Sequence, residues 1–157
     1  MSLRDTIAAV PFFQGLPDAH LDALAGCARE ARFADGEALL REGEGADQFY
    51  LLREGIVRLV MHWPHRGELT LETLGTGEVL GWSWIAPPYR WHFDAIARGG
   101  VRAIAFDARC LRGEMTSDPA FGYEMMSRFA AVISHRLQAA RMQMMDVYAP
   151  PGGEEAP

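Results

Sequence analysis

The most unusual stretch of this chain runs from Gly81 to Phe93, where aromatic rings and two basic side chains lie close together. It holds three of the four tryptophans and two more rings: Trp82, Trp84, Tyr89, Trp91 and Phe93. Ser83, Arg90 and His92 are its polar members. Arg90 and His92 stand two residues apart, so on a strand both side chains point to the same face. Rings beside cationic groups are typical of a pocket for an apolar or aromatic small molecule that carries an anionic group.

A second interpretation of the same stretch is purely structural. Large rings also fill space, and an aromatic-filled barrel would bind no ligand at all. The sequence leaves both interpretations open.

Other residue types that carry chemistry do not fall into catalytic or metal-binding patterns. His62 and His65 flank Trp63-Pro64 in a predicted hairpin turn, and neither they nor His92 have further ligands at a spacing that would close a metal site. No Ser or Cys has the context of a nucleophile, and no carboxylate pair has an acid–base spacing. We therefore expect a protein that is not an enzyme and that needs no metal or cofactor.

Composition narrows the class of protein further. The 157 residues suffice for one domain, 49% are hydrophobic, and no apolar run approaches the ~18 residues of a membrane-spanning helix. The net charge is −6, from 21 acidic residues against 15 basic ones, which disfavours contact with nucleic acid. Cys27 and Cys110 lie far apart in the chain and are expected to be buried, unpaired residues of a reducing compartment. These features predict a cytoplasmic protein.

The elements that must position the aromatic segment follow from glycine spacing and periodicity. Helical patterns over residues 3–10 and 17–28 precede short apolar or alternating segments over 32–107. Turn glycines punctuate those segments at short intervals, as at Glu54-Gly55 and Gly99-Gly100, which is typical of an antiparallel sandwich or barrel.

The last third of the chain is predicted to be helical. Asp107 can cap a short helix, and Ser117-Asp118-Pro119 is a strong start for a second helix that extends over about residues 118–146. Apolar residues recur along it at steps of three and four: Met126, Phe129, Ile133, Leu137 (or Arg136), Ala140 and Met144. Such a stripe predicts a two-helix dimer interface, because a helix ~35 Å long exceeds what so small a barrel covers. The alternative is packing on the chain's own barrel. Residues 147–157 are expected to form a disordered tail.

The order of these elements, with several motifs, resembles the cyclic nucleotide-binding domain of catabolite activator and FNR-like regulators. The matching motifs extend over about residues 8–145: Pro11-Phe12-Phe13, Leu16-Pro17, Gly36-Glu37, Glu42-Gly43-Glu44, Asp47 to Leu52 and Gly55 to Leu59. The resemblance implies a mainly β fold, a double-stranded β-helix (jelly roll) at about 30–107 with flanking helices, and a single domain over 1–146. It also implies a phosphate-binding cassette, in which a short helix offers backbone N–H groups, a Glu binds the ribose, and Arg followed by Ser or Thr binds the phosphate.

The cassette of this chain departs from that pattern. Gly77-Glu78-Val79-Leu80-Gly81 matches its opening, but Trp82 stands where the ribose Glu is expected. Ungapped counting puts His92 at the Arg position and Phe93 at the hydroxyl position. On the long helix, Ala140 and Arg141 occupy the positions of the hydroxyls that touch the purine.

The resulting hypothesis is a stand-alone ligand-sensing domain for signal transduction or transcription regulation, dimeric through its long helix. Its ligand would differ from cyclic AMP or bind differently. The predicted pocket comprises Gly77, Glu78, Gly81, Trp82, Ser83, Trp84, Arg90, His92, Phe93 and Arg141. The alternatives are a ligand-free dimeric interaction module and a genuine cyclic nucleotide binder that uses Arg90. The chain ends soon after the long helix, so we expect no helix-turn-helix, no direct DNA binding, and action through a regulatory protein partner.

Overall fold

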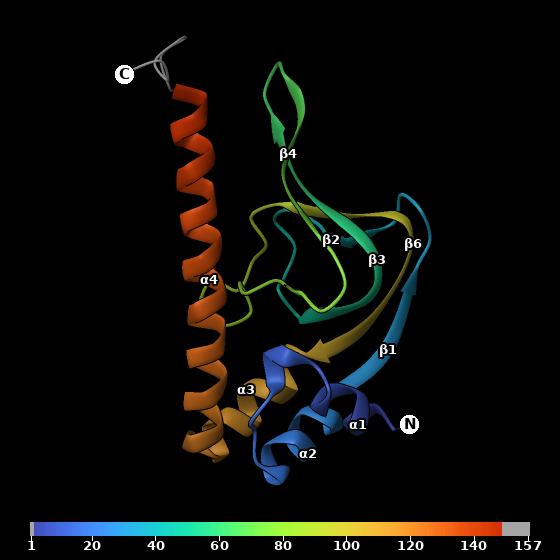
Figure 1. The fold of residues 1–157 in the computed structure, drawn as a ribbon, viewed down its shortest axis with the longest axis vertical. Coiled ribbons are helices and arrows are strands. Elements are labelled where there is room, and N and C mark those ends of the chain that lie inside the picture. Colours follow the sequence, from blue (N-terminus) through green and yellow to red (C-terminus); the bar gives the residue numbers. More distant parts are fainter. Residues whose placement is uncertain (1, 149–157) are drawn as a thin grey trace, which may run out of the picture.

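The computed structural model describes residues 2–148, and their side chains through residue 146. Three short N-terminal helices come first: α1 (Leu3–Ala8), η1 (Pro11–Phe13) and α2 (Asp18–Gly26). The strands are β1 (Ala28–Phe33), β2 (Ala38–Leu40), β3 (Gln48–Trp63), β4 (Gly67–Leu74), β5 (Val79–Leu80) and β6 (Asp94–Asp107). Two helices follow, α3 (Ala108–Ser117) and α4 (Pro119–Tyr148). The predicted fold class, a mainly antiparallel β roll with flanking helices, is confirmed (Figure 1).

Two long strands, β3 and β6, form the centre of the sheet. The strand order is β1-β6-β3-β4, while β2 also pairs with β6 and β5 with β3. The ladder between β3 and β6 shifts register around Glu54, where the two strands pass very close to each other. At Gly55, φ is +102° and an added Cβ would lie 2.5 Å from the carbonyl oxygen of Gly100, so only glycine fits.

An aromatic cluster joins the roll to the long helix. The ring of Phe49 stacks on Phe106 at 4.6 Å and on Trp84 at 5.0 Å between centroids. Phe129 of α4 meets Trp84 edge-on at 5.3 Å. All four rings are buried, so the first half of α4 shares the core of the roll.

This cluster corrects two of the predicted positions. Trp84 was expected to line a ligand pocket, but its side chain is fully buried in the core. Phe129 was expected in a dimer interface, and it packs inside its own chain instead. Both corrections have one cause. Large apolar side chains bury the surface where the roll meets α4, and Trp84 and Phe129 lie at that contact.

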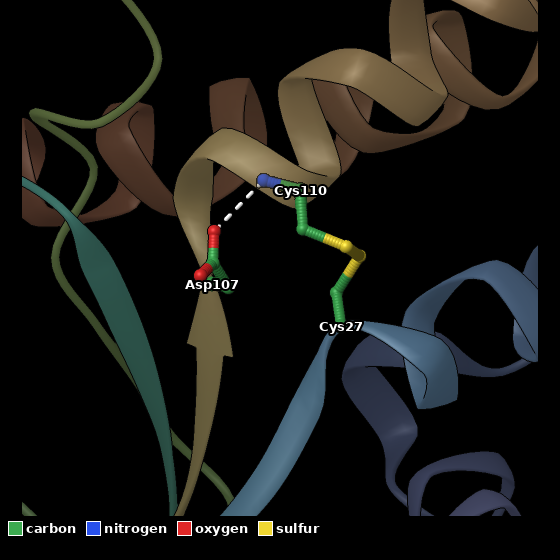
Figure 2. Close-up of a disulfide and its surroundings, with 3 residues drawn as sticks. All are labelled: Cys27, Asp107 and Cys110. Carbon is green, nitrogen blue, oxygen red and sulfur yellow. Dashed lines mark hydrogen bonds between the residues drawn. A yellow bond between two sulfur atoms is a disulfide. The ribbon is translucent and has the colours of Figure 1, made fainter.

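The two predicted helix starts agree with the structure. The carboxylate of Asp107 accepts a hydrogen bond from the backbone N–H of Cys110 at 2.8 Å and caps α3 (Figure 2). Asp118 accepts from the N–H of Ala120 at 3.1 Å at the start of α4. Helix α4 continues through Tyr148, past the predicted end near residue 146; the rest of the predicted tail lies outside the described residues.

The prediction of unpaired cysteines is wrong, because Cys27 and Cys110 form a disulfide (Figure 2). Their Cα atoms are 5.7 Å apart, although 83 positions separate them in sequence. Cys27 caps the end of α2 and Cys110 lies in the first turn of α3, so the bond ties the N-terminal helices to the start of the C-terminal ones. Sequence spacing gave no sign of this contact, because β1 and β6 bring the two residues together only when they pair.

Candidate functional site

The opening of the cassette is a tight backbone bend against a tryptophan ring. Gly81 follows β5 with φ +100°, and an added Cβ would lie 2.6 Å from the ring of Trp91. Trp91 is 4% exposed and packs with the core, so it closes the space over the bend and leaves no room there for a ligand.

The segment after the bend lacks the short helix that the resemblance implies for binding phosphate. Residues 82–93, all of them described, contain turns and bends but no helix. Two of the backbone N–H groups are used within the segment, since Ile85 donates to Trp82 and Tyr89 donates to Ala86. No helix N-terminus is therefore available in this segment for an anion.

A groove of about 380 Å³ lies between the roll and α4, next to this segment. The roll contributes Leu59, Leu71, Glu72, Trp82 and Phe93. Helix α4 contributes Ile133, Arg136, Leu137, Ala139, Ala140 and Gln143. Most of these side chains are apolar, and the volume lies within the ~300–1,000 Å³ typical of small-molecule sites. We call this the Trp82 groove.

Among the described side chains, Arg136 is the one cationic residue that lines the Trp82 groove, and it is 8% exposed. Its Nη2 donates a hydrogen bond to the backbone carbonyl of Val79. Its guanidinium lies 5.1 Å from the ring centroid of Trp82, a cation–π distance. Burial lowers the pKa of Arg136, against the opposing effect of Glu72, whose Oε1 lies 3.8 Å from Nε.

The predicted pocket residues separate into several places. Trp82 and Phe93 line the Trp82 groove, together with Ile133, Leu137 and Ala140 of the predicted dimer stripe. Gly77 and Glu78 line a second hollow of about 380 Å³ on another side of α4, with Arg136 between the two. Ser83 is partly exposed, and neither it nor Arg141 contributes to the groove.

The two basic residues expected to hold an anion do not do so in the groove. Arg90 Nη1 donates to the carbonyl of Gly43 at 2.9 Å and lines a separate polar hollow. His92 is exposed and is not a lining residue of the Trp82 groove. The cation that lines the groove is Arg136, which the predicted pocket did not include; its place three residues after Ile133 on the apolar stripe was the available signal.

A buried carboxylate stabilises the strand next to the groove. Asp94, which follows Phe93, accepts a hydrogen bond from the N–H of Glu42 at 2.7 Å and lies 2.9 Å from Nε2 of His62. Burial raises the pKa of Asp94, but the bonds from Glu42 and His62 outweigh it and hold that pKa below its ordinary value. The β3–β4 hairpin is thus tied to β6, and His62 has a structural partner.

Within residues 2–148, no group of three or more His, Cys, Asp or Glu side chains is placed to hold a metal ion. None of the helices described is both long enough and apolar enough to span a bilayer.

Comparisons with known proteins agree with the fold of the roll. The chain is 24% identical over 145 residues to a CRP-like cAMP-activated global transcriptional regulator of Mycobacterium tuberculosis, covering 92% of this chain and 63% of that regulator. It therefore spans just under two thirds of the length of this relative.

Solved structures of related proteins have the same fold. A putative cyclic nucleotide-binding protein from Geobacter metallireducens superposes with a TM-score of 0.79 at 28% identity, covering 87% of this chain and 99% of that one. The catabolite activator protein of Thermus thermophilus superposes with a TM-score of 0.68 at 22% identity, covering 87% of this chain and 62% of that one.

The family model described as "Cyclic nucleotide-binding domain" matches residues 30–118. This chain belongs to the cyclic nucleotide-binding domain family and is related to its CRP-like regulators.

Proposed function

We propose that this chain is a regulatory, non-enzymatic ligand-binding domain that holds a small molecule with a flat apolar body in the Trp82 groove. The observation that carries the proposal is the position of Trp82. It stands where the resemblance expects the ribose-binding Glu, and its ring faces α4 across a groove lined mainly by apolar side chains. An indole offers a stacking surface in place of a hydrogen-bond acceptor.

The same geometry disfavours the family's usual contacts with a cyclic nucleotide. The residue at the phosphate-binding Arg position, His92, is exposed, and Phe93 stands at the hydroxyl position. Arg90, the candidate for an alternative cyclic nucleotide site, is hydrogen-bonded to Gly43 in a different hollow.

The position of the groove also links ligand binding to the position of α4. Its two sides belong to different elements, the roll and α4, so an occupant that contacts both biases the position of the helix. We propose that a second copy of the chain pairs along the C-terminal half of α4. That half exposes large apolar side chains: Leu137, Met142, Met144 and Met145.

The relatives are transcriptional regulators, which favours a cytoplasmic role in gene control. The net charge of −6 disfavours direct contact with DNA by this domain, so its output would pass to a partner protein. The rival proposal is a ligand-free dimeric module, and the buried rings of Trp84 and Trp91 favour it because they fill space in the core.

Tryptophan fluorescence and calorimetry test the proposal together. Cyclic AMP, cyclic GMP, cyclic di-GMP and a set of small aromatic compounds would be titrated into the wild-type protein and into Trp82→Phe. We expect saturable heat and a spectral change with an aromatic compound, and loss of the spectral change in Trp82→Phe, since Trp84 and Trp91 are buried away from the groove. A wild-type spectrum indifferent to every compound would favour the ligand-free module. Tight binding of a cyclic nucleotide would instead support the alternative that this domain is a cyclic nucleotide binder.

A further inference from the structure

The guanidinium of Arg136 has one nitrogen without a partner in a buried place. Nη2 donates to the carbonyl of Val79, and Nε faces Glu72 at 3.8 Å, too long for a hydrogen bond. Nη1 is buried and has no hydrogen-bond partner within the described part of the chain. An unsatisfied buried donor is costly, and more so on a charged group, so Nη1 is the donor of Arg136 that remains for a ligand.

Two carboxylates, Glu72 and Glu78, act on the charge of Arg136, but its contact with Glu72 is long, at 3.8 Å. Glu72 is the nearest carboxylate, and a third of its side chain is exposed. Burial raises the pKa of Glu72, with Arg136 opposing that shift, which marks a site where the negative charge of Glu72 is not strongly stabilised.

From these two observations we infer that the ligand of the Trp82 groove is a small aromatic carboxylate, whose acid group accepts a hydrogen bond from Arg136 and whose ring packs against Trp82 and Phe93. This inference rests on the proposed function and names its ligand class. A guanidinium with an open N–H is suited to a carboxylate oxygen. The remaining lining residues, Leu59, Leu71, Leu137 and Ala140 among them, suit the apolar body.

A nucleotide fits this lining less well. Its phosphate, sugar hydroxyls and base nitrogens all need partners when buried. The polar side chains that line the groove are Glu72, Arg136 and Gln143. A single acid group on an apolar ring brings only two oxygen atoms that need donors, and Arg136 and Gln143 are the lining residues that can donate.

Two nearly isosteric probes separate charge recognition from apolar binding: 1-naphthoate and its neutral carboxamide, 1-naphthamide. Calorimetry with the wild-type protein is expected to give 1-naphthoate an affinity about ten- to a hundredfold higher, the range for a hydrogen bond to a charged group. Equal affinities would overturn the inference and leave the proposed function standing. No binding of either probe would overturn both. Cyclic AMP binding more tightly than 1-naphthoate would also overturn the inference.

Arg136 variants then locate the discrimination. In Arg136→Met the preference for the acid is expected to disappear while 1-naphthamide still binds, and Arg136→Lys should keep part of the preference. A purely structural role would weaken both probes equally and leave their ratio unchanged, which would contradict the inference. Arg98→Gln, an exposed arginine away from the groove, is the matched control and should behave as wild type. Circular dichroism and thermal unfolding show which variants are folded, and Arg136→Lys covers the case in which Arg136→Met is not.

Discussion

The guanidinium of Arg136 on α4 lies 5.1 Å from the ring centroid of Trp82 on the roll, and this pair joins the two sides of the groove. Where the resemblance expects a Glu, the ring replaces an anionic partner with a neutral π face. A ring face offers the guanidinium no hydrogen-bond acceptor, whereas a carboxylate would have offered two oxygens. A neutral ring at this position is consistent with the apolar lining of the groove and with the unpaired Nη1 of Arg136.

Trp82 and Trp84 are expected to have opposite roles although they stand two residues apart. Trp84→Ala removes a fully buried ring and should lower the free energy of unfolding by about 3–5 kcal/mol. Trp82→Ala should cost roughly 1–2 kcal/mol, since the ring is only partly buried, and should abolish ligand binding. Urea denaturation measures both values; equal losses of stability would contradict the assignment of Trp82 to the groove.

Glu72 competes with the proposed ligand for Arg136. Glu72→Gln removes that carboxylate and should tighten 1-naphthoate binding about two- to fivefold, the scale of a partly exposed ion pair. Binding of 1-naphthamide should not change. Glu68→Gln, an exposed position on the same strand paired with Arg58, is the control. Weaker binding in Glu72→Gln would mean that Glu72 positions Arg136 instead of competing with the ligand.

The Cys27–Cys110 bond closes a large part of the chain into a loop, with 83 positions between its ends. Breaking it with dithiothreitol should lower the free energy of unfolding by about 2–5 kcal/mol. Denaturation with and without reductant measures the loss. The Cys27→Ser/Cys110→Ser variant should match the reduced wild type and be insensitive to reductant. A wild type that is equally stable in both conditions would show that the thiols are unpaired in solution.

Asp94 should contribute to stability in a pH-dependent way. Its pKa is below the ordinary value of 3.8, so its ionised form stabilises the folded state. The contribution is fully present above about pH 4 and is lost as the pH falls through the lower folded pKa. Asp94→Asn should be less stable than wild type at pH 7, and the gap should narrow towards pH 2. If the difference in stability between wild type and Asp94→Asn stays constant from pH 7 to pH 2, the charge of Asp94 does not contribute to stability.

The dimer prediction is tested on the exposed part of α4. Met144 is 61% exposed, so Met144→Asp should leave the monomer folded while breaking a helix–helix interface. Size-exclusion chromatography with light scattering should show a dimer for wild type and a monomer for the variant. Gln138→Asp, exposed on a different side of the helix, should remain dimeric. A monomeric wild type would refute the dimer itself.

The sequence by itself determined the elements and their order. Turn glycines such as Gly55 and Gly99 adopt positive φ, and the capping carboxylates Asp107 and Asp118 start α3 and α4 where the sequence predicts them. These are local effects, because a backbone angle or a helix cap depends on a few neighbouring residues.

Only the tertiary structure decided which rings are core and which line the groove, that Cys27 meets Cys110, and that Arg136 rather than Arg90 faces the apolar groove. Each of these depends on how β3, β6 and α4 pack, over separations of tens of residues. Trp82 and Trp84 stand two residues apart in a turn and point to different sides of the chain. Sequence spacing does not show which side α4 will cover.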